Sequence, residues 1–260
     1  MKIKDILSRI DAVAPFHKAA DWDNVGLMVG DPEWEVKRLG LTLDPLPEAM
    51  EEAFLCGCQC LLSHHPMFLE PLRCIDFSTA AGRVIQAAIK TEMAILSAHT
   101  NWDAAEGGVS LALAERLELG GIVPLVRAED GFGGMGAIGN MPTATPLGGV
   151  LVSIKEALNL SRLDYYGERE LRILRVALCG GSGGSLWPLA HKMKADLYIT
   201  ADMKYHDIMD CVRSNLGVAV VDHAEMESVS LLELARHLEV PGELEVVLLS
   251  YRGLESPLRL

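Results

Sequence analysis

The feature that most constrains the fold is an alternation of short apolar runs with amphipathic segments along the whole chain. Strand-like runs lie at 39–44, 58–63, 93–98, 171–179, 195–200, 217–221 and 244–250. Segments with apolar residues at helical spacing lie at 3–13, 46–56, 79–91, 107–119, 147–160, 185–194, 204–215 and 224–238. This alternation predicts an α/β fold with mainly parallel sheets flanked by helices.

The alternation occurs in two similar halves. In each half three strands alternate with two helices, and the third strand runs into a histidine followed four residues later by a carboxylate: His99 and Asp103, then His223 and Glu227. We interpret the halves as two similar lobes. An internal duplication explains the likeness, and so does the alternation that any doubly wound α/β protein shows.

Glycine content locates the division between the lobes. Residues 120–148 hold eight of the 24 glycines, which predicts loops around a short strand. We expect one lobe over 1–125 plus about 224–260 and a second over 126–223, with the last helix and strand packing back on the first lobe. The segment AADWDNVGLMVGD (19–31) is interpreted as a loop.

Charge and composition exclude several classes of protein. The net charge of the 260 residues is −13, which disfavours non-specific binding to nucleic acid. No apolar run reaches the roughly 18 residues that span a bilayer, and charges interrupt the first helix, so we expect neither membrane insertion nor secretion. Six cysteines are too few for a disulfide framework in a chain of this length. We therefore expect a cytoplasmic protein.

Polar residues with metal-binding side chains follow three of the apolar strands. They occur in LLS-HHP, ILSA-HTNWD and VVD-HAEME, and the ligands that we predict are His64, His65, Asp103, His223 and Glu227. Ligands of open α/β sheets bind beyond the carboxyl ends of the strands. Imidazole and carboxylate donors suit Zn, Mn, Fe or Ni, and five donors exceed the needs of one tetrahedral ion. We therefore predict two divalent ions per chain, bridged by Glu227.

Three other motifs have two interpretations each. Gly180–Gly184 fits the nucleophile-elbow pattern around Ser182, with Asp202 and His223 downstream in the order of a hydrolase triad. The same turn, Cys179–Ser185, is either an anion-binding loop or, as we prefer, a tight turn without a ligand. The run from Cys56 to Cys60 is either a thiolate metal site or, as we prefer, one buried face of a strand. His17, His191 and His237 are interpreted as ordinary helix histidines.

The motifs together resemble a known family. The segments AADWDNVGLMVGD, LLSHHPMFL, SAHTNWD, CGGSGG, YITADMKYHD and VVDHAEMES occur in the order found in the NGG-interacting-factor-like family of dinuclear metal proteins, also named the GTP cyclohydrolase 1 type 2 family. The resemblance extends from the first helix to about residue 230. It implies the same five ligands, with His99 close to the metals as a further ligand or a neighbour.

The resemblance also implies an architecture. It indicates a metal site in the cleft between two α/β lobes, a ring-like homohexamer, and the short form of the family without an inserted domain. The chain departs from the family pattern at Asp222 and Ala201, where glycine is usual. Asp222 would place a second acidic group beside His223.

The sequence supports two classes of function. The first is a metal-dependent hydrolase in which metal-activated water attacks a small-molecule substrate such as a nucleotide, as in GTP cyclohydrolase 1 type 2. Asp202, Lys204 and His206 are further candidates for the cleft. The second is a non-catalytic metal-binding regulator or metal chaperone that acts through protein partners. Both classes need the same ligands.

Overall fold

The computed structural model describes residues 1–250, and these residues form two compact units. Unit 1 comprises residues 1–105 and the segment from Leu231 onward, and unit 2 comprises residues 106–230. The second division falls inside helix α9 (His223–Leu238). The glycine-rich segment and the repeated pattern predict these two boundaries near residues 125 and 223. The predicted first lobe also includes residues 251–260, which lie outside the described residues.

Unit 1 contains a five-stranded sheet in the order β1-β4-β3-β2-β13. Its strands are β1 (Gly26–Val29), β2 (Arg38–Thr42), β3 (Cys60–Ser63), β4 (Ala94–Ser97) and β13 (Glu245–Leu248). Strands β13, β2, β3 and β4 are parallel, and only β1 runs antiparallel, beside β4. All four residues of β3 and of β4 are buried, as expected for strands covered on both faces.

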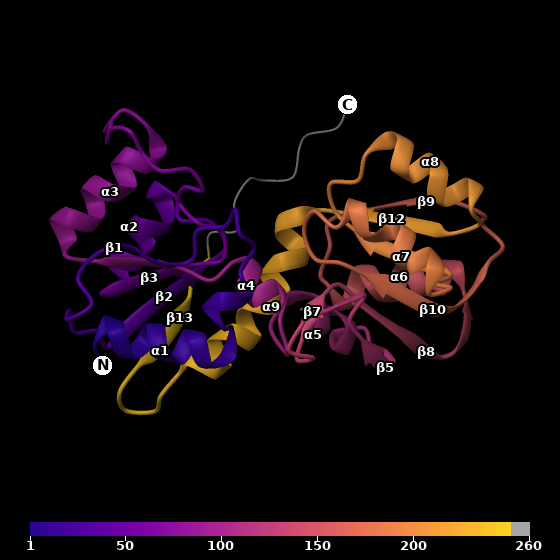
Figure 1. Cartoon of the computed structure of the whole chain (residues 1–260), viewed down its shortest axis with the longest axis horizontal. Helices are drawn as coiled ribbons and strands as arrows, with labels where there is room; N and C mark the ends of the chain where they lie inside the picture. Colours follow the sequence, from indigo (N-terminus) through magenta and orange to yellow (C-terminus); the bar gives the residue numbers. More distant parts are fainter. Residues whose placement is uncertain (251–260) are drawn as a thin grey trace. The chain divides into compact units, whose positions relative to one another are not determined.

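Helices cover both faces of this sheet (Figure 1). On one face, α2 (Pro47–Leu55) and α3 (Ala80–Thr91) pack apolar residues such as Met50 and Val84 against Leu61 and Ile95. On the other, α1 (Ile3–Val13) buries three isoleucines at helical spacing, Ile3, Ile6 and Ile10. A short helix, α4 (Thr100–Asp103), follows β4 after two intervening residues, and a single 3-10 turn, η1 (Phe16–Lys18), follows α1.

Unit 2 contains a six-stranded sheet in the order β5-β8-β10-β11-β12-β9. Its strands are β5 (Gly120–Val123), β8 (Ala137–Pro146), β9 (Leu163–Tyr166), β10 (Arg172–Leu178), β11 (Leu197–Thr200) and β12 (Gly217–Val221). The three strands β10, β11 and β12 are parallel. The other three pairings are antiparallel, so this sheet is mixed rather than mainly parallel. A two-stranded ribbon, β6 (Val126–Arg127) and β7 (Gly134–Met135), lies apart from it.

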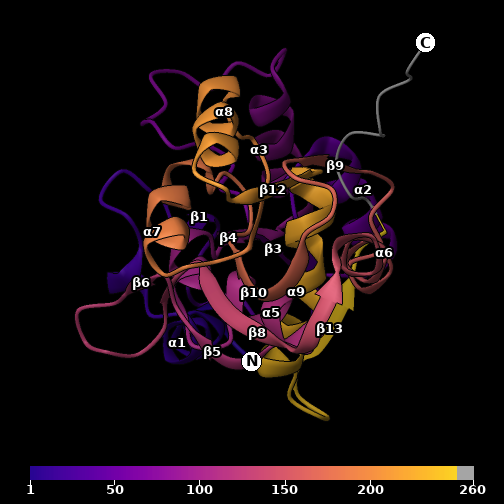
Figure 2. The same cartoon turned by 90° about the vertical axis from the view of Figure 1, so that its right-hand side faces the viewer.

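The alternation of side chains along β10 shows which helices cover each face of this sheet. Ala177 belongs to the core formed with α7 (Trp187–Lys192) and α8 (Tyr205–Arg213). Val176, which points the opposite way, lines a cavity with residues of α5 (Val109–Arg116) and α6 (Leu147–Ala157). Figure 2 shows α7 and α8 on one side of the sheet and α6 on the other. A 3-10 turn, η2 (Gly184–Leu186), leads into α7.

The structure corrects three local predictions. The segment 19–31, interpreted as a loop, contains strand β1; its alternation is hidden by glycines and acidic residues. Residues 120–148, interpreted as loops around a short strand, contain four strands, of which β8 is ten residues long. No strand was predicted at 163–166, where β9 lies.

The cysteine run does not form one face of a strand. Only Cys60 lies in β3, whereas Cys56 is the C-cap of α2 and Cys58 is buried in the turn between them. The helix-to-strand turn changes the direction of the chain within the run, so the three thiols do not share one face. Burial raises the pKa of the Cys58 thiol to about 11, which is typical of an inert thiol.

Candidate metal centre

In unit 1, the neighbouring parallel strands β3 and β4 end side by side, and three histidines lie just after these strand ends. His64 and His65 follow Ser63, the last residue of β3, and His99 is the second residue after β4. The register pairs Ser63 with Ser97, so the two strands end at the same level. The imidazoles therefore emerge at one edge of the sheet, as the sequence analysis expects for ligands in open α/β sheets.

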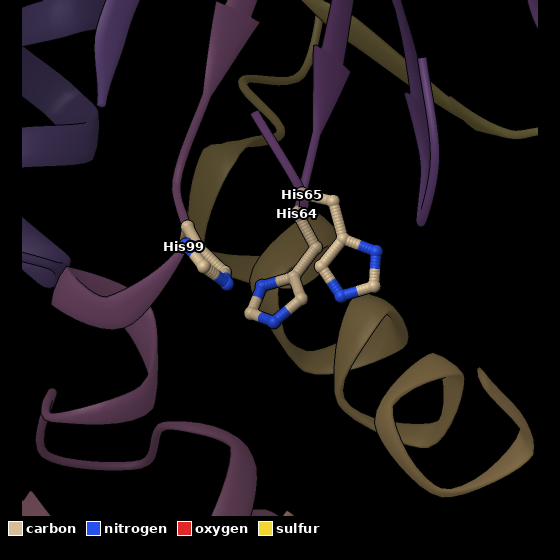
Figure 3. Close-up of side chains that lie close together, drawn as sticks. All are labelled: His64, His65 and His99. Carbon is tan, nitrogen blue, oxygen red and sulfur yellow. The ribbon is translucent and has the colours of Figure 1, made fainter. Parts of the chain in front are cut away.

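The three imidazoles converge (Figure 3). Their ring centroids lie 5.1 Å (His64–His65), 5.2 Å (His64–His99) and 5.5 Å (His65–His99) apart. One potential ligand atom from each lies within 4.8 Å of the other two. Three protonated imidazoles at this separation would repel one another, whereas three neutral ones offer lone pairs to a cation. The cluster has the donor chemistry of a transition-metal site.

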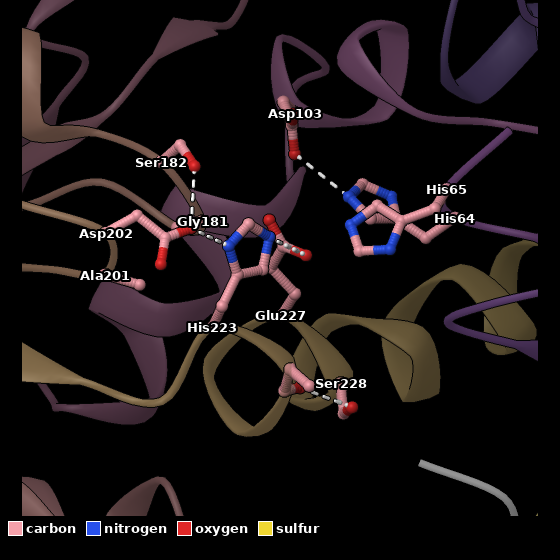
Figure 4. Close-up of polar contacts among 12 residues, drawn as sticks. His64, His65, Asp103, Gly181, Ser182, Ala201, Asp202, His223, Glu227 and Ser228 are labelled. Carbon is pink, nitrogen blue, oxygen red and sulfur yellow. Dashed lines mark hydrogen bonds and ion pairs between the residues drawn. The ribbon is translucent and has the colours of Figure 1, made fainter. Parts of the chain in front are cut away.

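Asp103 adds a carboxylate to this cluster. It lies at the end of α4, one turn beyond His99, and its backbone N–H donates to the carbonyl of His99. Its Oδ1 is 3.6 Å from Nε2 of the fully buried His64 (Figure 4). The structure thus brings together His64, His65 and Asp103, and also His99, for which the sequence analysis left two roles open.

Nδ1 of each of the three histidines, His64, His65 and His99, contacts an oxygen. Nδ1 of His65 lies 2.8 Å from Oδ1 of Asp44, and Nδ1 of His99 lies 2.8 Å from Oδ1 of Asp23. Nδ1 of His64 is 3.0 Å from the carbonyl oxygen of Ala98. The two aspartates were not identified from the sequence. Asp44 is the second residue after β2, a polar residue at a strand end, and that signal could have found it.

Asp23 is held by several donors at once. Burial opposes ionisation of this carboxylate, but hydrogen bonds from His99 and from the Thr100 hydroxyl and backbone outweigh it, so the pKa of Asp23 is lowered. The carboxylate is therefore ionised near neutral pH and can only accept. Trp22, its neighbour, presents its ring edge-on to His99. The segment 19–31 that carries the family resemblance thus reaches the histidine cluster within unit 1.

In unit 2 the candidate ligands lie in the first two turns of α9. His223 and Glu227 are four residues apart, and Nε2 of His223 lies 3.0 Å from Oε2 of Glu227. The prediction that the helix begins near residue 223 is confirmed. The Glu227 side chain is buried, which is unusual for an isolated carboxylate.

A second carboxylate flanks His223. Its Nδ1 lies 2.5 Å from Oδ2 of Asp202, the second residue after β11 (Figure 4). The hydrogen bond to Glu227, and then that to Asp202, outweigh burial and raise the pKa of His223 to about 9. For Asp202, burial opposes ionisation, but hydrogen bonds from His223 and Ser182 outweigh it and lower its pKa. Asp202 thus has a definite contact, whereas no contact assigns Lys204 or His206 a role.

The glycine-rich segment after β10 forms a tight turn that leaves space for the side chains of His223 and Glu227. Gly181 has a φ of +63°, and a Cβ there would lie 2.0 Å from Oε1 of Glu227. The amides of Gly180 and Gly183 donate within unit 2, to the hydroxyls of Ser110 and Thr200. They are therefore used internally rather than presented to an anion.

The arrangement around Ser182 is not that of a hydrolase triad. Its hydroxyl donates to Oδ2 of Asp202 at 2.8 Å, and the same oxygen contacts His223. The carboxylate therefore lies between serine and histidine, whereas activation of a serine needs the imidazole next to the hydroxyl. The geometry does not support the nucleophile-elbow interpretation.

Comparison with known proteins identifies the family. The model of the Duf34/NIF3 (NGG1p interacting factor 3) family matches residues 1–252. A GTP cyclohydrolase 1 type 2 homolog of Clostridium perfringens is 32% identical over 240 residues, covering 92% of each chain. The chain belongs to the Duf34/NIF3 family. The resemblance inferred from the motifs is therefore confirmed.

Solved structures of other proteins share the fold. The structure of a Bacillus cereus protein related to NIF3 superposes with a TM-score of 0.91 at 21% identity, over 99% of each chain. Reduced HcgD from Methanocaldococcus jannaschii gives a TM-score of 0.82 at 27% identity, over 96% of this chain and 98% of that one. The predicted α/β fold with helix-flanked sheets is confirmed. Within residues 1–250, no helix is both long and apolar enough to cross a membrane.

Proposed function

We propose that this Duf34/NIF3 protein is a dinuclear-metal-dependent hydrolase. The proposed ligands are His64, His65, Asp103, His223 and Glu227, and the ions are two of Zn, Mn, Fe or Ni. The proposed substrate is a small molecule such as a nucleotide. The observation that carries the proposal is the group of three histidines with ligand atoms within 4.8 Å of one another, beside Asp103.

The chemistry of the donors fits borderline transition metals better than Mg or Ca. Imidazole nitrogen dominates in unit 1, whereas Mg and Ca prefer all-oxygen sites. Unit 2 supplies one imidazole and one buried carboxylate, too few for a closed four-coordinate site. We therefore propose that the donors of both units serve one centre, with Glu227 as the bridging carboxylate.

The protein's own residues have separable tasks in this proposal. Bound divalent ions would supply a hydroxide nucleophile near neutral pH and polarise the bond to be cleaved. The burial of His64 and Glu227 keeps bulk water from these two donors. Gly181 leaves the space that the Glu227 carboxylate needs, because any larger residue would overlap it.

Metal analysis tests the centre directly. We expect about two transition-metal ions per chain in protein purified without an affinity tag or added metal. Glu227→Ala is expected to lose much of this metal, and Glu115→Ala, an exposed glutamate of α5, to keep it. Metal-free wild-type protein that also fails to bind Zn or Mn on titration would contradict the proposal.

Substrate turnover decides between the two classes of function. The names of the GTP cyclohydrolase 1 type 2 homologs lead to GTP as the first substrate to test, followed by phosphoesters. Metal-loaded wild-type protein is expected to release formate from GTP, and the Glu227→Ala variant is not. Full metal occupancy without turnover of any of these compounds would favour the alternative, a metal-binding regulator or chaperone.

We further propose a cytoplasmic homo-oligomer, a hexamer by the family resemblance. All six cysteines are free thiols, which supports a reducing compartment. Light scattering coupled to size exclusion measures the mass of the assembly, and a monomer would contradict this part of the proposal.

A further inference from the structure

Three aspartates outside the proposed ligand set share one geometric relation to the histidines. Asp44, Asp23 and Asp202 each place a carboxylate oxygen at Nδ1 of a different histidine, at 2.8, 2.8 and 2.5 Å. They come from three different positions: after β2, before β1, and after β11. Each aspartate contacts the same ring atom, Nδ1, and in His223 this leaves Nε2 on the side of Glu227, 3.0 Å from its Oε2.

We propose that Asp44, Asp23 and Asp202 are positioning residues that fix the Nδ1–H tautomer of His65, His99 and His223, so that Nε2 of each is the atom that faces a metal. An ionised carboxylate can only accept a hydrogen bond, so the proton must lie on Nδ1. The lone pair of a neutral imidazole is then on Nε2. The inference rests on the proposed metal centre and names residues that control it.

His64 supports the same inference with a different acceptor. Its Nδ1 faces the backbone carbonyl of Ala98, which also can only accept. Its Nε2 is the atom directed toward Asp103. All four histidines therefore present the same nitrogen, although one is held by a neutral carbonyl and three by carboxylates.

Two of the three carboxylates, those of Asp23 and Asp202, are themselves held in place. Asp23 accepts from the backbone N–H and the hydroxyl of Thr100 in addition to His99. Asp202 accepts from Ser182 as well as from His223. A carboxylate with two or more donors cannot rotate away from its histidine without losing other hydrogen bonds. Such partners orient metal-bound histidines and raise their basicity.

The tautomers of His65 and His99 provide the first test. Long-range proton–nitrogen NMR spectra of the metal-free protein at about pH 8, where an ordinary imidazole is neutral, distinguish the two tautomers. We expect Nδ1–H for both. Asp44→Asn is expected to change only the His65 signals, and Asp23→Asn only those of His99. Nε2–H tautomers in the wild type would overturn the proposal, and this readout does not depend on metal binding or turnover.

Metal affinity provides the second test, for the two aspartates that contact the proposed ligands His65 and His223. Competition for Zn²⁺ with a chromophoric chelator is expected to show about 10- to 100-fold weaker binding for Asp44→Asn and Asp202→Asn. Asp210→Asn, an exposed aspartate of α8, is the matched control and should bind as the wild type does. Unchanged affinity in both Asp44→Asn and Asp202→Asn would overturn the proposal. Wild-type protein that binds no Zn²⁺ would instead refute the proposed function. The NMR spectra would then still decide whether Asp44 and Asp23 fix the tautomers of His65 and His99.

Discussion

The two units of the molecule share one run of helices and strands in the same order. Unit 1 runs α1-β1-β2-α2-β3-α3-β4, and unit 2 runs α6-β9-β10-α7-β11-α8-β12. In both, three parallel strands lie side by side, and an antiparallel strand, β1 or β9, pairs with the last of them. The other edge differs, since β13 is parallel to β2 whereas β8 is antiparallel to β10. The likeness extends beyond the three strands recognised from the sequence, which favours an internal duplication.

The residues that follow equivalent strands differ between the two units, although the strands themselves are arranged alike. The second residues after β2, β3 and β4 are Asp44, His65 and His99, and those after β10, β11 and β12 are Gly180, Asp202 and His223. Only the last position keeps histidine in both units. At the middle position unit 1 has a candidate ligand, whereas unit 2 has the carboxylate that holds one. The repeated fold thus fixes where chemistry can occur, and the residue type decides which part each unit performs.

The largest expected effect tests the packing of unit 2 around its ligands. Gly181→Ala is expected to cost about 4 kcal/mol, from left-handed backbone strain and from overlap with Glu227, and to lower the metal content. Gly121 has the same φ of +63° with nothing near its Cβ position, so Gly121→Ala isolates the strain, at about 1 kcal/mol. Urea denaturation measures both. Equal costs would show that the close approach to Glu227 is unimportant.

A slightly smaller effect tests whether equivalent strands contribute equally. Leu61 in β3 and Leu197 in β11 are both completely buried in the second parallel strand of their units. Replacing either with alanine is expected to cost about 3 kcal/mol of unfolding free energy. Thermal and urea unfolding of both variants check this. A cost below about 1 kcal/mol in one of them would show that the two cores are not equivalent in packing.

Thiol reactivity compares the opening of the two units. Burial raises the pKa of the Cys60 thiol in unit 1 well above its usual range, and it raises the pKa of Cys211 in unit 2 to about 12. Few of these thiols therefore ionise near neutral pH. Cys74 is exposed. Iodoacetamide at about pH 8 is expected to alkylate Cys74 more than about 100-fold faster than Cys211, as followed by mass spectrometry.

The same reagent in increasing urea shows whether the units open together. Cys60 and Cys211 report on different units, so a shared midpoint of reactivity would indicate one cooperative transition. Separate midpoints would show that the duplicated folds differ in stability. Rapid alkylation of Cys211 in the native protein would contradict its burial.

The smallest effect concerns Ser182. Its hydroxyl makes one hydrogen bond, to Asp202, so Ser182→Ala is expected to cost about 1 kcal/mol and to leave the metal content unchanged. A serine-directed fluorophosphonate should not label the wild type. Stoichiometric labelling of Ser182 would restore the hydrolase triad that the geometry disfavours.

The sequence predicts those parts of the molecule that depend on local pattern. Continuous apolar runs predict the parallel strands to within two residues at each end, and Gly217–Val221 with the observed bounds, because these strands are largely buried on both faces. The edge strands β1 and β9 and most of β8, which lies inside its sheet, were not predicted because they mix apolar residues with glycine, proline and aspartate. Their pairing comes from tertiary contacts that no local pattern encodes.

In the candidate site too, the sequence predicts what local pattern determines and not what depends on tertiary contacts. The five predicted ligands lie directly after strands or in the first two turns of a helix, positions that sequence pattern identifies. Asp23 lies 76 residues from the histidine that it contacts, and nothing local marks it as a partner. Its contact depends on the packing of the segment before β1 against the end of β4.

The chain order of the units has a consequence for synthesis on the ribosome. Unit 2 is one continuous segment, whereas unit 1 is interrupted by it, and the ion pair of Arg38 with Glu245 joins residues 207 apart. Because β13 emerges long after β2, the sheet of unit 1 keeps an unpaired edge at β2 while the whole of unit 2 is made. The nascent chain therefore carries an exposed strand edge for most of its translation, and this is the stage at which chaperone protection matters most.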